Sequence, residues 1–180
     1  MRCVVAITGC SGIRYGIRLL EELEGDKVLI VSDMGRKVLE HEADIGYDDL
    51  CSLADEVYDD HDLFAPPASG THVVDAMVVC PCSQSTIAKL AAGISDSLLT
   101  RAASVTLKER RRLVLVPRET PLNVIMLENE LALARAGATI LPASPAFYHG
   151  PRSVDMMIDF VVGKVLDQLG QDHDLFKRWE

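Results

Sequence analysis

Two residues of opposite charge, Arg118 and Glu119, follow a run of four apolar residues at 113–116. Such a run is typical of a strand buried on both faces. Pro117 ends it, because proline has no N–H to donate to a neighbouring strand. A base and an acid therefore lie side by side at the carboxyl end of a strand, where open α/β sheets bind ligands. A second interpretation stays open at this point, a charged pair on an exposed loop with little effect on stability.

Three other expected strand ends carry glycine or hydroxyl side chains just before a helix. Helix N-termini offer free N–H groups and partial positive charge, and hydroxyls add further donors, so each can bind phosphate. Each alone is commonly an ordinary helix cap, but together at one end of a sheet they indicate a phosphorylated cofactor. The residues are Gly9, Cys10 and Ser11; Ser32; and Ser83, Gln84, Ser85 and Thr86.

Several common motifs are absent. Ser11 and Arg14 stand where the dinucleotide fingerprint GxGxxG requires glycine, and no GxxxxGK[ST] phosphate loop occurs. The paired aspartates at 48–49 and 59–60 do not extend to the DDxxD of magnesium-dependent prenyl-transfer enzymes. The histidines have no ligand spacing, and Cys80-Pro81-Cys82 is not a CxxC pair, so we expect no metal site.

Composition narrows the class of protein. A chain of 180 residues with 48% hydrophobic residues is expected to form one domain with a large core. The formal charge of −9 argues against a nucleic-acid surface. Five cysteines without regular spacing argue against a disulfide framework, and no apolar run is long enough to span a bilayer. We expect a soluble, cytoplasmic protein without a signal peptide.

Apolar periodicity predicts strands that alternate with helices. The strands are expected at 3–7, 28–31, 76–80, 113–116 and 139–141. The helices are expected at about 13–23, 33–42, 48–54, 84–92, 96–110, 121–135 and 154–169, with Pro121 opening the sixth and Gly137 ending it. This order predicts a single α/β domain over residues 1–180, with a doubly wound, mainly parallel, flavodoxin-like (Rossmann-like) sheet and helices on both faces. The C-terminal helix and tail from about residue 153 are expected to complete the site and the oligomer.

Seven segments together resemble the flavin prenyltransferase family. They are TGCSGIRYGIRLL, PPASGT, CPCSQSTIAKLAAG, RAASVTLKERRRLVLVPRETPL, MLEN, PAFY and FVVGKVLDQLG, and the likeness runs in order from residue 3 to about 170. These enzymes make the prenylated flavin used by a partner family of reversible decarboxylases. The related flavin-dependent cysteine decarboxylases share the fold and give the enzyme alternative. A non-catalytic flavin-binding or delivery protein is the other alternative.

The resemblance implies that flavin mononucleotide (FMN) contacts Gly9, Cys10, Ser11, Ser32, Ser83, Gln84, Ser85, Thr86 and Arg118. It also implies that Tyr148 and Lys164 hold dimethylallyl phosphate, with Arg101, Lys108 and Glu119 closing around the phosphate. The family is dodecameric with sites between subunits, so a neighbouring chain can supply some groups. Cys10 stands where alanine is common, and Leu63 where some members have tryptophan, which affects the expected walls of the site.

The implied reaction joins the dimethylallyl group to N5 and C6 of reduced FMN without a metal ion. Fixed cations and the Tyr148 hydroxyl would stabilise the departing phosphate where its charge develops. Glu119 is the first candidate for the base near C6, and Ser11 and Glu42 could relay protons. A surface helix acid with no chemical role stays an alternative interpretation of Glu42.

Overall fold

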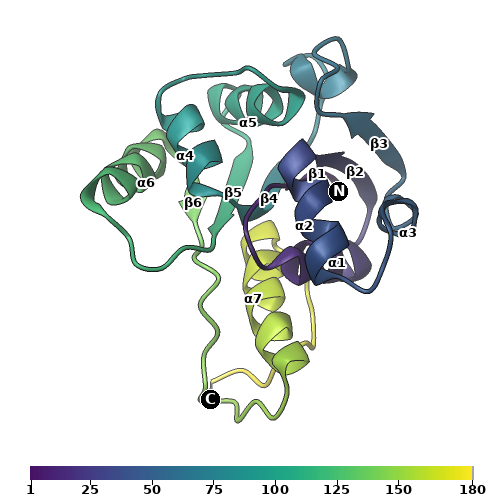
Figure 1. Ribbon diagram of the computed structural model, residues 1–180, viewed down its shortest axis with the longest axis vertical. Helices are drawn as coiled ribbons and strands as arrows, with labels where there is room; N and C mark the ends of the chain where they lie inside the picture. Colours follow the sequence, from purple (N-terminus) through teal and green to yellow (C-terminus); the bar gives the residue numbers. More distant parts are fainter. Residues whose placement is uncertain (180) are drawn as a thin grey trace.

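A sheet of six parallel strands organises the chain, in the order β3-β2-β1-β4-β5-β6. The computed structural model describes residues 1–179 (Figure 1). The strands are β1 (Arg2–Ile7), β2 (Asp26–Val31), β3 (Glu56–Asp59), β4 (Ala76–Cys82), β5 (Arg112–Pro117) and β6 (Thr139–Ile140). The chain winds outward from β1 in one direction and from β4 in the other, so the order reverses between these two strands. Ligands of doubly wound sheets bind at this reversal, beyond the carboxyl ends of the strands.

Helices cover both faces of the sheet, which confirms the predicted fold class (Figure 1). One face packs against α1 (Ile13–Glu22), α2 (Asp33–Glu42), α3 (Tyr47–Cys51) and α7 (Val154–Leu169). The other face packs against α4 (Gln84–Ala91), α5 (Leu98–Lys108) and α6 (Val124–Ala136), with a short 3-10 turn, η1 (Pro66–Ala68), beside α5. The side chains of β4 are buried along its whole length, as expected for a central strand covered on both sides.

The structure differs from the sequence prediction in three elements. Residues 56–59 form an edge strand, β3, whose alternately half-buried and exposed residues have no continuous apolar run. β4 continues through Pro81 to Cys82, with an irregular register towards β5 after Val79. The prediction that Pro121 opens a helix is wrong: α6 begins at Val124, because the Asn123 side chain accepts a hydrogen bond from the Met126 N–H at 3.0 Å.

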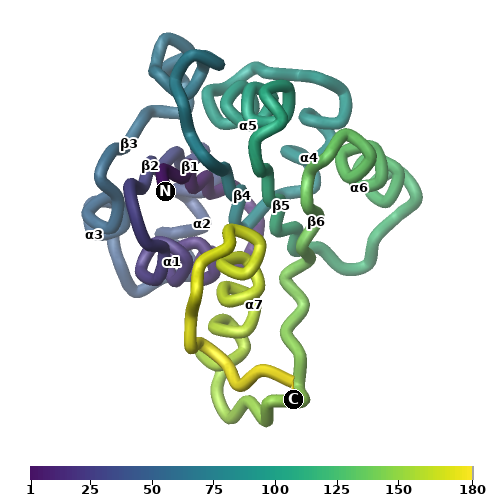
Figure 2. Tube along the Cα trace, turned by 180° about the vertical axis from the view of Figure 1, so that it is seen from behind, coloured from purple at the N-terminus to yellow at the C-terminus, as the bar shows by residue number. Residues whose placement is uncertain are grey.

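The last helix, α7, packs beside α1 in the same direction. Arg14 pairs with Asp155, and Arg18 Nε lies 2.8 Å from an Asp159 oxygen. An extended connection from β6 leads to the start of α7, and the C-terminal segment runs back beside it (Figure 2). Residues 141–179, which comprise this connection, α7 and the C-terminal segment, form an arm that the buried side chains of α7 anchor on one face of the sheet. Among residues 1–179, no helix has both the length and the hydropathy needed to cross a bilayer.

Gly16 allows α1 to lie directly on the sheet. A Cβ at this position would lie 2.4 Å from the Cys80 carbonyl oxygen and 3.0 Å from Ile7 Cδ1. We expect Gly16→Ala to cost about 1–3 kcal/mol of stability, because the backbone of β4 has to move. The melting temperature, measured at equal protein concentration, should fall by several degrees. Gly46→Ala is the matched control, since its nearest neighbour would be an Asp49 oxygen at 3.4 Å; an equal loss in both variants would contradict the explanation.

Candidate functional site

The turn between β1 and α1 is held by a carboxylate from another helix. Gly12 precedes α1 with φ 106° and has no side chain to cap it. Glu42, the last residue of α2, accepts a hydrogen bond from the Gly12 N–H at 2.8 Å and a longer one from the Ile13 N–H at 3.4 Å. The negative charge also lies at the positive end of the α1 dipole, which is a favourable position. Glu42 therefore fixes the glycine turn in place of a local cap.

Glu42 also interacts with two predicted site residues, Ser11 and Arg118. Its burial opposes ionisation, but hydrogen bonds from the Ser11 hydroxyl and the two N–H groups, with the charge of Arg118, outweigh burial and lower the pKa of Glu42. Arg118 in turn donates from Nε to the Ser11 carbonyl oxygen at 3.1 Å. Ser11, Glu42 and Arg118 thus form one network at the carboxyl end of the sheet.

Glu119 follows Arg118 in the chain, but the hydrogen bond of its side chain is local. Its side chain is exposed, and Oε1 accepts a hydrogen bond from the Thr120 N–H at 3.2 Å. Within the part of the chain that the structure describes, no cation pairs with it. A carboxylate with this freedom can exchange protons with a bound molecule.

The predicted hydroxyl residues face one cavity. This cavity, of about 410 Å³, lies between the first turns of α2 and α4. Ser32 Oγ accepts from the Gly35 N–H at 3.1 Å, and Ser83 Oγ accepts from the Thr86 N–H at 3.2 Å, so each serine caps its own helix. The predicted residues that line the cavity are Gly9, Ser32, Ser83, Ser85 and Thr86.

Thr8 is a site residue that the sequence analysis did not identify. Its hydroxyl accepts a hydrogen bond from the Ser83 N–H at 2.7 Å and donates to the Pro81 carbonyl oxygen at 2.8 Å. This buried threonine ties the end of β1 to the end of β4 across the reversal of the sheet. A polar residue at the end of an apolar run, just before a glycine turn, was the available signal.

Gln84, beside this cavity, tests whether a flavin nucleotide fits at this end of the sheet. Gly9 has a structural reason of its own: a Cβ there would lie 2.2 Å from Met34 Cβ, so glycine lets the loop after β1 pack on α2. Gln84 donates from Nε2 to Glu130 at 2.7 Å, while its Oε1 is buried with no hydrogen-bond partner within residues 1–179. A buried carbonyl oxygen without a donor is costly unless a ligand supplies one, and a flavin ring carries an N–H donor. The residues present therefore fit a flavin mononucleotide.

Cys10 contributes a small neutral wall to the same region. Burial raises the pKa of its thiol to about 11, and the smaller effects of Thr8 and Arg118 do not reverse this. The side chain therefore stays protonated at neutral pH and packs as a small hydrophobe rather than as a nucleophile.

The residues predicted to hold the allylic phosphate lie in two other regions of the chain. Tyr148 belongs to the arm, where its ring packs edge-on against Phe160 at 6.0 Å and Trp179 at 5.2 Å between centroids. Lys164 lies on α7, with Nζ 2.9 Å from an Asp167 oxygen.

Arg101 and Lys108 lie on α5. Arg101 donates from Nε to the Ala68 carbonyl oxygen at 3.0 Å, and Lys108 pairs with Glu109. Lys108 ends α5, before β5 begins, whereas Arg118 follows the end of that six-residue strand. A strand of this length separates its two ends by about 20 Å, so one chain does not bring Lys108 to Arg118.

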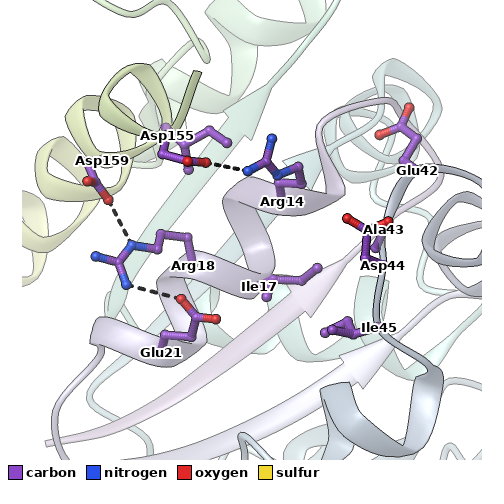
Figure 3. Close-up of a pocket in the computed structure, with 11 residues that line it drawn as sticks. Arg14, Ile17, Arg18, Glu21, Glu42, Ala43, Asp44, Ile45, Asp155 and Asp159 are labelled. Carbon is purple, nitrogen blue, oxygen red and sulfur yellow. Dashed lines mark hydrogen bonds and ion pairs between the residues drawn. The ribbon is translucent and has the colours of Figure 1, made fainter. Parts of the chain in front are cut away.

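A second cavity, of about 510 Å³, lies between α1, the end of α2 and the start of α7 (Figure 3). Its arginines are already paired with acids of α7, as Figure 3 shows for Arg14 with Asp155 and Arg18 with Asp159. Glu42 borders this cavity and also reaches the Ser11 turn. Among the described residues, no group of three or more side chains is arranged to bind a metal ion.

Asp167 holds the arm together. Its oxygens lie 2.9 Å from Lys164 Nζ, 2.8 Å from Arg178 Nη2 and 3.2 Å from His173 Nε2. Burial would raise its pKa, but hydrogen bonds from Arg178 and Lys164 dominate and lower the pKa to about 2. One acid thus fixes a predicted phosphate-binding lysine and the C-terminal segment that packs on Tyr148.

Comparisons with known proteins agree with this geometry. The family described as Flavoprotein matches residues 1–167. A flavin prenyltransferase UbiX of Thermoplasma acidophilum is 52% identical over 180 residues, covering 99% of this chain and 100% of the relative. The chain belongs to the flavin prenyltransferase family.

Solved structures extend the likeness to the whole backbone. A UbiX (PadA1) crystal structure in complex with FMN and dimethylallyl pyrophosphate superposes with a TM-score of 0.98 at 43% identity, covering 99% of this chain and 97% of the other. A structure described as a dodecameric FMN-dependent UbiX-like decarboxylase from Escherichia coli O157:H7 gives a TM-score of 0.97 at 41% identity and covers 100% of both chains.

Replacing Asp167 tests the arm. We expect Asp167→Asn to release the C-terminal segment at neutral pH, because Lys164 and Arg178 lose their shared anion. Because the folded pKa of Asp167 is depressed, its contribution is present above the ordinary carboxyl pKa near 4 and is lost as pH falls towards 2.

Trp179 is the only tryptophan, so the steady-state anisotropy of its fluorescence reports the segment directly. Anisotropy should fall in Asp167→Asn at neutral pH, and in the unmodified protein only on acidification. Asp174→Asn, which alters an exposed acid of the same segment, should behave as the unmodified protein. Equal anisotropy in all three proteins at neutral pH would contradict the role of Asp167.

Proposed function

We propose that this enzyme transfers the dimethylallyl group of dimethylallyl phosphate to N5 and C6 of reduced FMN and so makes prenylated FMN. The observation that carries the proposal is the network of Ser11, Glu42 and Arg118 beside the hydroxyl-lined cavity, at the reversal of the sheet. The reduced flavin supplies the two nucleophilic ring positions. The chain's own residues bind it, hold the phosphate donor and move protons.

The cavity between α2 and α4 is the proposed site of the flavin's terminal phosphate. The hydroxyls of Ser32, Ser83 and Thr86 and the N-termini of two helices supply donors there. Gly9 lines the same cavity, and beside it Gln84 offers its free carbonyl oxygen to the N–H of the flavin ring. Cys10, Ser11, Ser85 and Arg118 complete the proposed flavin-binding set.

Fixed cations stabilise the phosphate leaving group. As the allylic C–O bond breaks, negative charge grows on the phosphate, and we assign its stabilisation to Arg101, Lys108 and Lys164 with the Tyr148 hydroxyl. These groups need no reorganisation when they are held in advance, as Lys164 is by Asp167. The same placement orients the donor towards the flavin.

Proton movement requires a base close to the flavin and a route away from it. We assign the base to Glu119, whose exposed carboxylate adjoins Arg118. We assign the route to Ser11 and Glu42, whose side chains meet at the glycine turn and so offer a hydrogen-bonded path.

A complete site requires more than one copy of the chain. The proposed donor-binding residues occupy three separate regions: the carboxyl end of the sheet, α5 and the arm. The surface of α6 is apolar, with Val124, Ile125, Leu127 and Leu131 all exposed, and Phe147 of the arm is exposed as well. Such a surface is typical of a subunit interface. We propose a homododecamer, like the E. coli relative, in which neighbours bring the three regions together, and whose product goes to a prenylated-FMN-dependent decarboxylase.

Mass spectrometry of the flavin tests the proposed reaction. After anaerobic incubation with reduced FMN and dimethylallyl phosphate, the extracted flavin should gain the mass of one five-carbon group. Glu119→Gln should keep FMN but lose about 100-fold or more in rate, because general-base catalysis contributes roughly that factor. Flavin of unchanged mass, or a decarboxylated peptidyl cysteine in a parallel incubation, would contradict the assignment. The diphosphate donor, tested in parallel, separates the two leaving groups.

Mixing inactive variants tests whether the site is shared. Lys108→Ala should raise the KM for the donor or abolish turnover, because a phosphate contact is lost. If Lys108 and Glu119 of one site come from different chains, dissociating and reassembling equal amounts of Lys108→Ala and Glu119→Gln should restore about a quarter of the sites. Recovered activity is measured by the same mass assay. No recovery in mixed oligomers of normal size would place both residues of a site on one chain.

A further inference from the structure

His61 and Asp33 form an ion pair at the rim of the cavity between α2 and α4. His61 Nε2 lies 3.1 Å from each Asp33 carboxylate oxygen. Both residues line the cavity that Ser32 and Ser83 enter with their hydroxyls. Both side chains are also accessible, with 72% and 67% of their areas exposed. Neither residue has a role in the function proposed above.

The charge of this cavity does not favour an anion. Its lining contains Lys89, His61 and three aspartates. Lys89 is already paired with Asp96 at 2.8 Å. Asp60 is buried at the start of α5, where its Oδ1 accepts from the Leu99 N–H at 2.7 Å. With a neutral His61, the formal charge of the lining is negative, and a phosphate meets an uncompensated Asp33. With a protonated His61, that acid is neutralised.

The surroundings of His61 favour its charged form. The hydrogen bond to Asp33 and the charge of that carboxylate raise the pKa of His61, and the charges of Asp59 and Asp60 act in the same direction. The charged groups around this imidazole are Asp33 of α2, Asp59 at the end of β3, Asp60 in the following turn, Lys89 of α4 and Asp96 before α5. Apart from Lys89, which has its own acid, they are all negative.

We propose that His61 supplies a protonation-dependent counter-charge for the terminal phosphate of flavin mononucleotide, a role that rests on the proposed flavin-binding function. When protonated, the imidazolium cancels Asp33 and attracts the phosphate. When neutral, it leaves Asp33 to repel the phosphate. By linkage, phosphate binding also favours protonation of His61, so FMN takes up protons as it binds.

Flavin titrations of the intact oligomer test this role. Affinities for FMN and for riboflavin, which lacks the phosphate, are measured by fluorescence quenching at about pH 6 and about pH 8.5. The phosphate of FMN itself titrates in this range. The quantity compared is therefore the ratio of FMN affinity at the lower pH to that at the higher pH, measured in the unmodified protein and in His61→Gln. As the pH rises between these two values, we expect the unmodified protein to lose about fivefold more FMN affinity than His61→Gln does. This factor is the effect of one unit charge at close range in water. Riboflavin should show no such difference.

Two further variants separate charge from structure. His41→Gln removes an exposed histidine from the other end of α2 and should behave as the unmodified protein. Asp33→Asn removes the repulsive acid, and at about pH 8.5 it should bind FMN more tightly than the unmodified protein does. Calorimetry in two buffers of different ionisation enthalpy should show greater proton uptake with FMN in the unmodified protein than in His61→Gln.

The outcomes distinguish this proposal from the one on which it rests. If FMN binds with the same pH ratio and proton uptake in the unmodified protein and in His61→Gln, the role of His61 is overturned and the proposed function stands. If the pH difference appears equally with riboflavin, the counter-charge is not directed at the phosphate, and the proposal also fails. If the unmodified protein binds neither flavin, both proposals fall together.

Discussion

A single carboxylate, that of Glu42, connects the turns that form the site. Gly12 has a left-handed conformation that few other residues adopt, so the start of α1 has no side-chain cap of its own. Glu42 supplies the missing acceptor from the far end of α2, across 30 positions of sequence. Because Ser11 and Arg118 join the same network, hydrogen bonds connect the loops after β1 and β5 to the end of α2. The same Glu42 contacts stabilise the start of α1 and shape the site, so a substitution at Glu42 affects both.

This dependence on distant contacts separates what sequence predicts from what it does not. Alternating apolar runs and helical periods predict the parallel sheet, and sequence order then places Ser32, Ser83 and Arg118 at one end of it. The capping role of Glu42 and the bridge made by Thr8 follow from tertiary contacts that no local pattern contains. β3 was missed for a related reason, because an edge strand with one partner needs no apolar run. Pro121 suits the first turn of a helix, but Asn123 offers a better cap two residues later.

The chain carries a formal charge of −9, yet the proposed function requires it to bind two phosphates. Its cations meet this requirement in pairs with acids: Lys89 with Asp96, Lys108 with Glu109 and Lys164 with Asp167. An acid partner orients a lysine but also neutralises it, so a phosphate that reaches it gains less than it would from a free cation. Moderate binding suits an enzyme that must release inorganic phosphate and a modified flavin after each turnover. Strong binding of both ground and product states would slow that release without accelerating the chemical step.

The separation of the proposed donor-binding residues into three regions has a further consequence for the chain. Each region is fixed by its own contacts: the turn by Glu42, α5 by Asp60 and the arm by Asp167. A single chain can therefore hold each part of the site in its final shape before any neighbour is present. In the proposed oligomer, assembly then has to align preformed surfaces instead of ordering flexible ones, which lowers the entropy lost on association. The apolar residues exposed on α6 are unfavourable in water for an isolated chain, and burying them would favour the proposed oligomer. On the proposed function, the same burial that stabilises the assembly also completes the catalytic centre, so an isolated chain can be folded without being active.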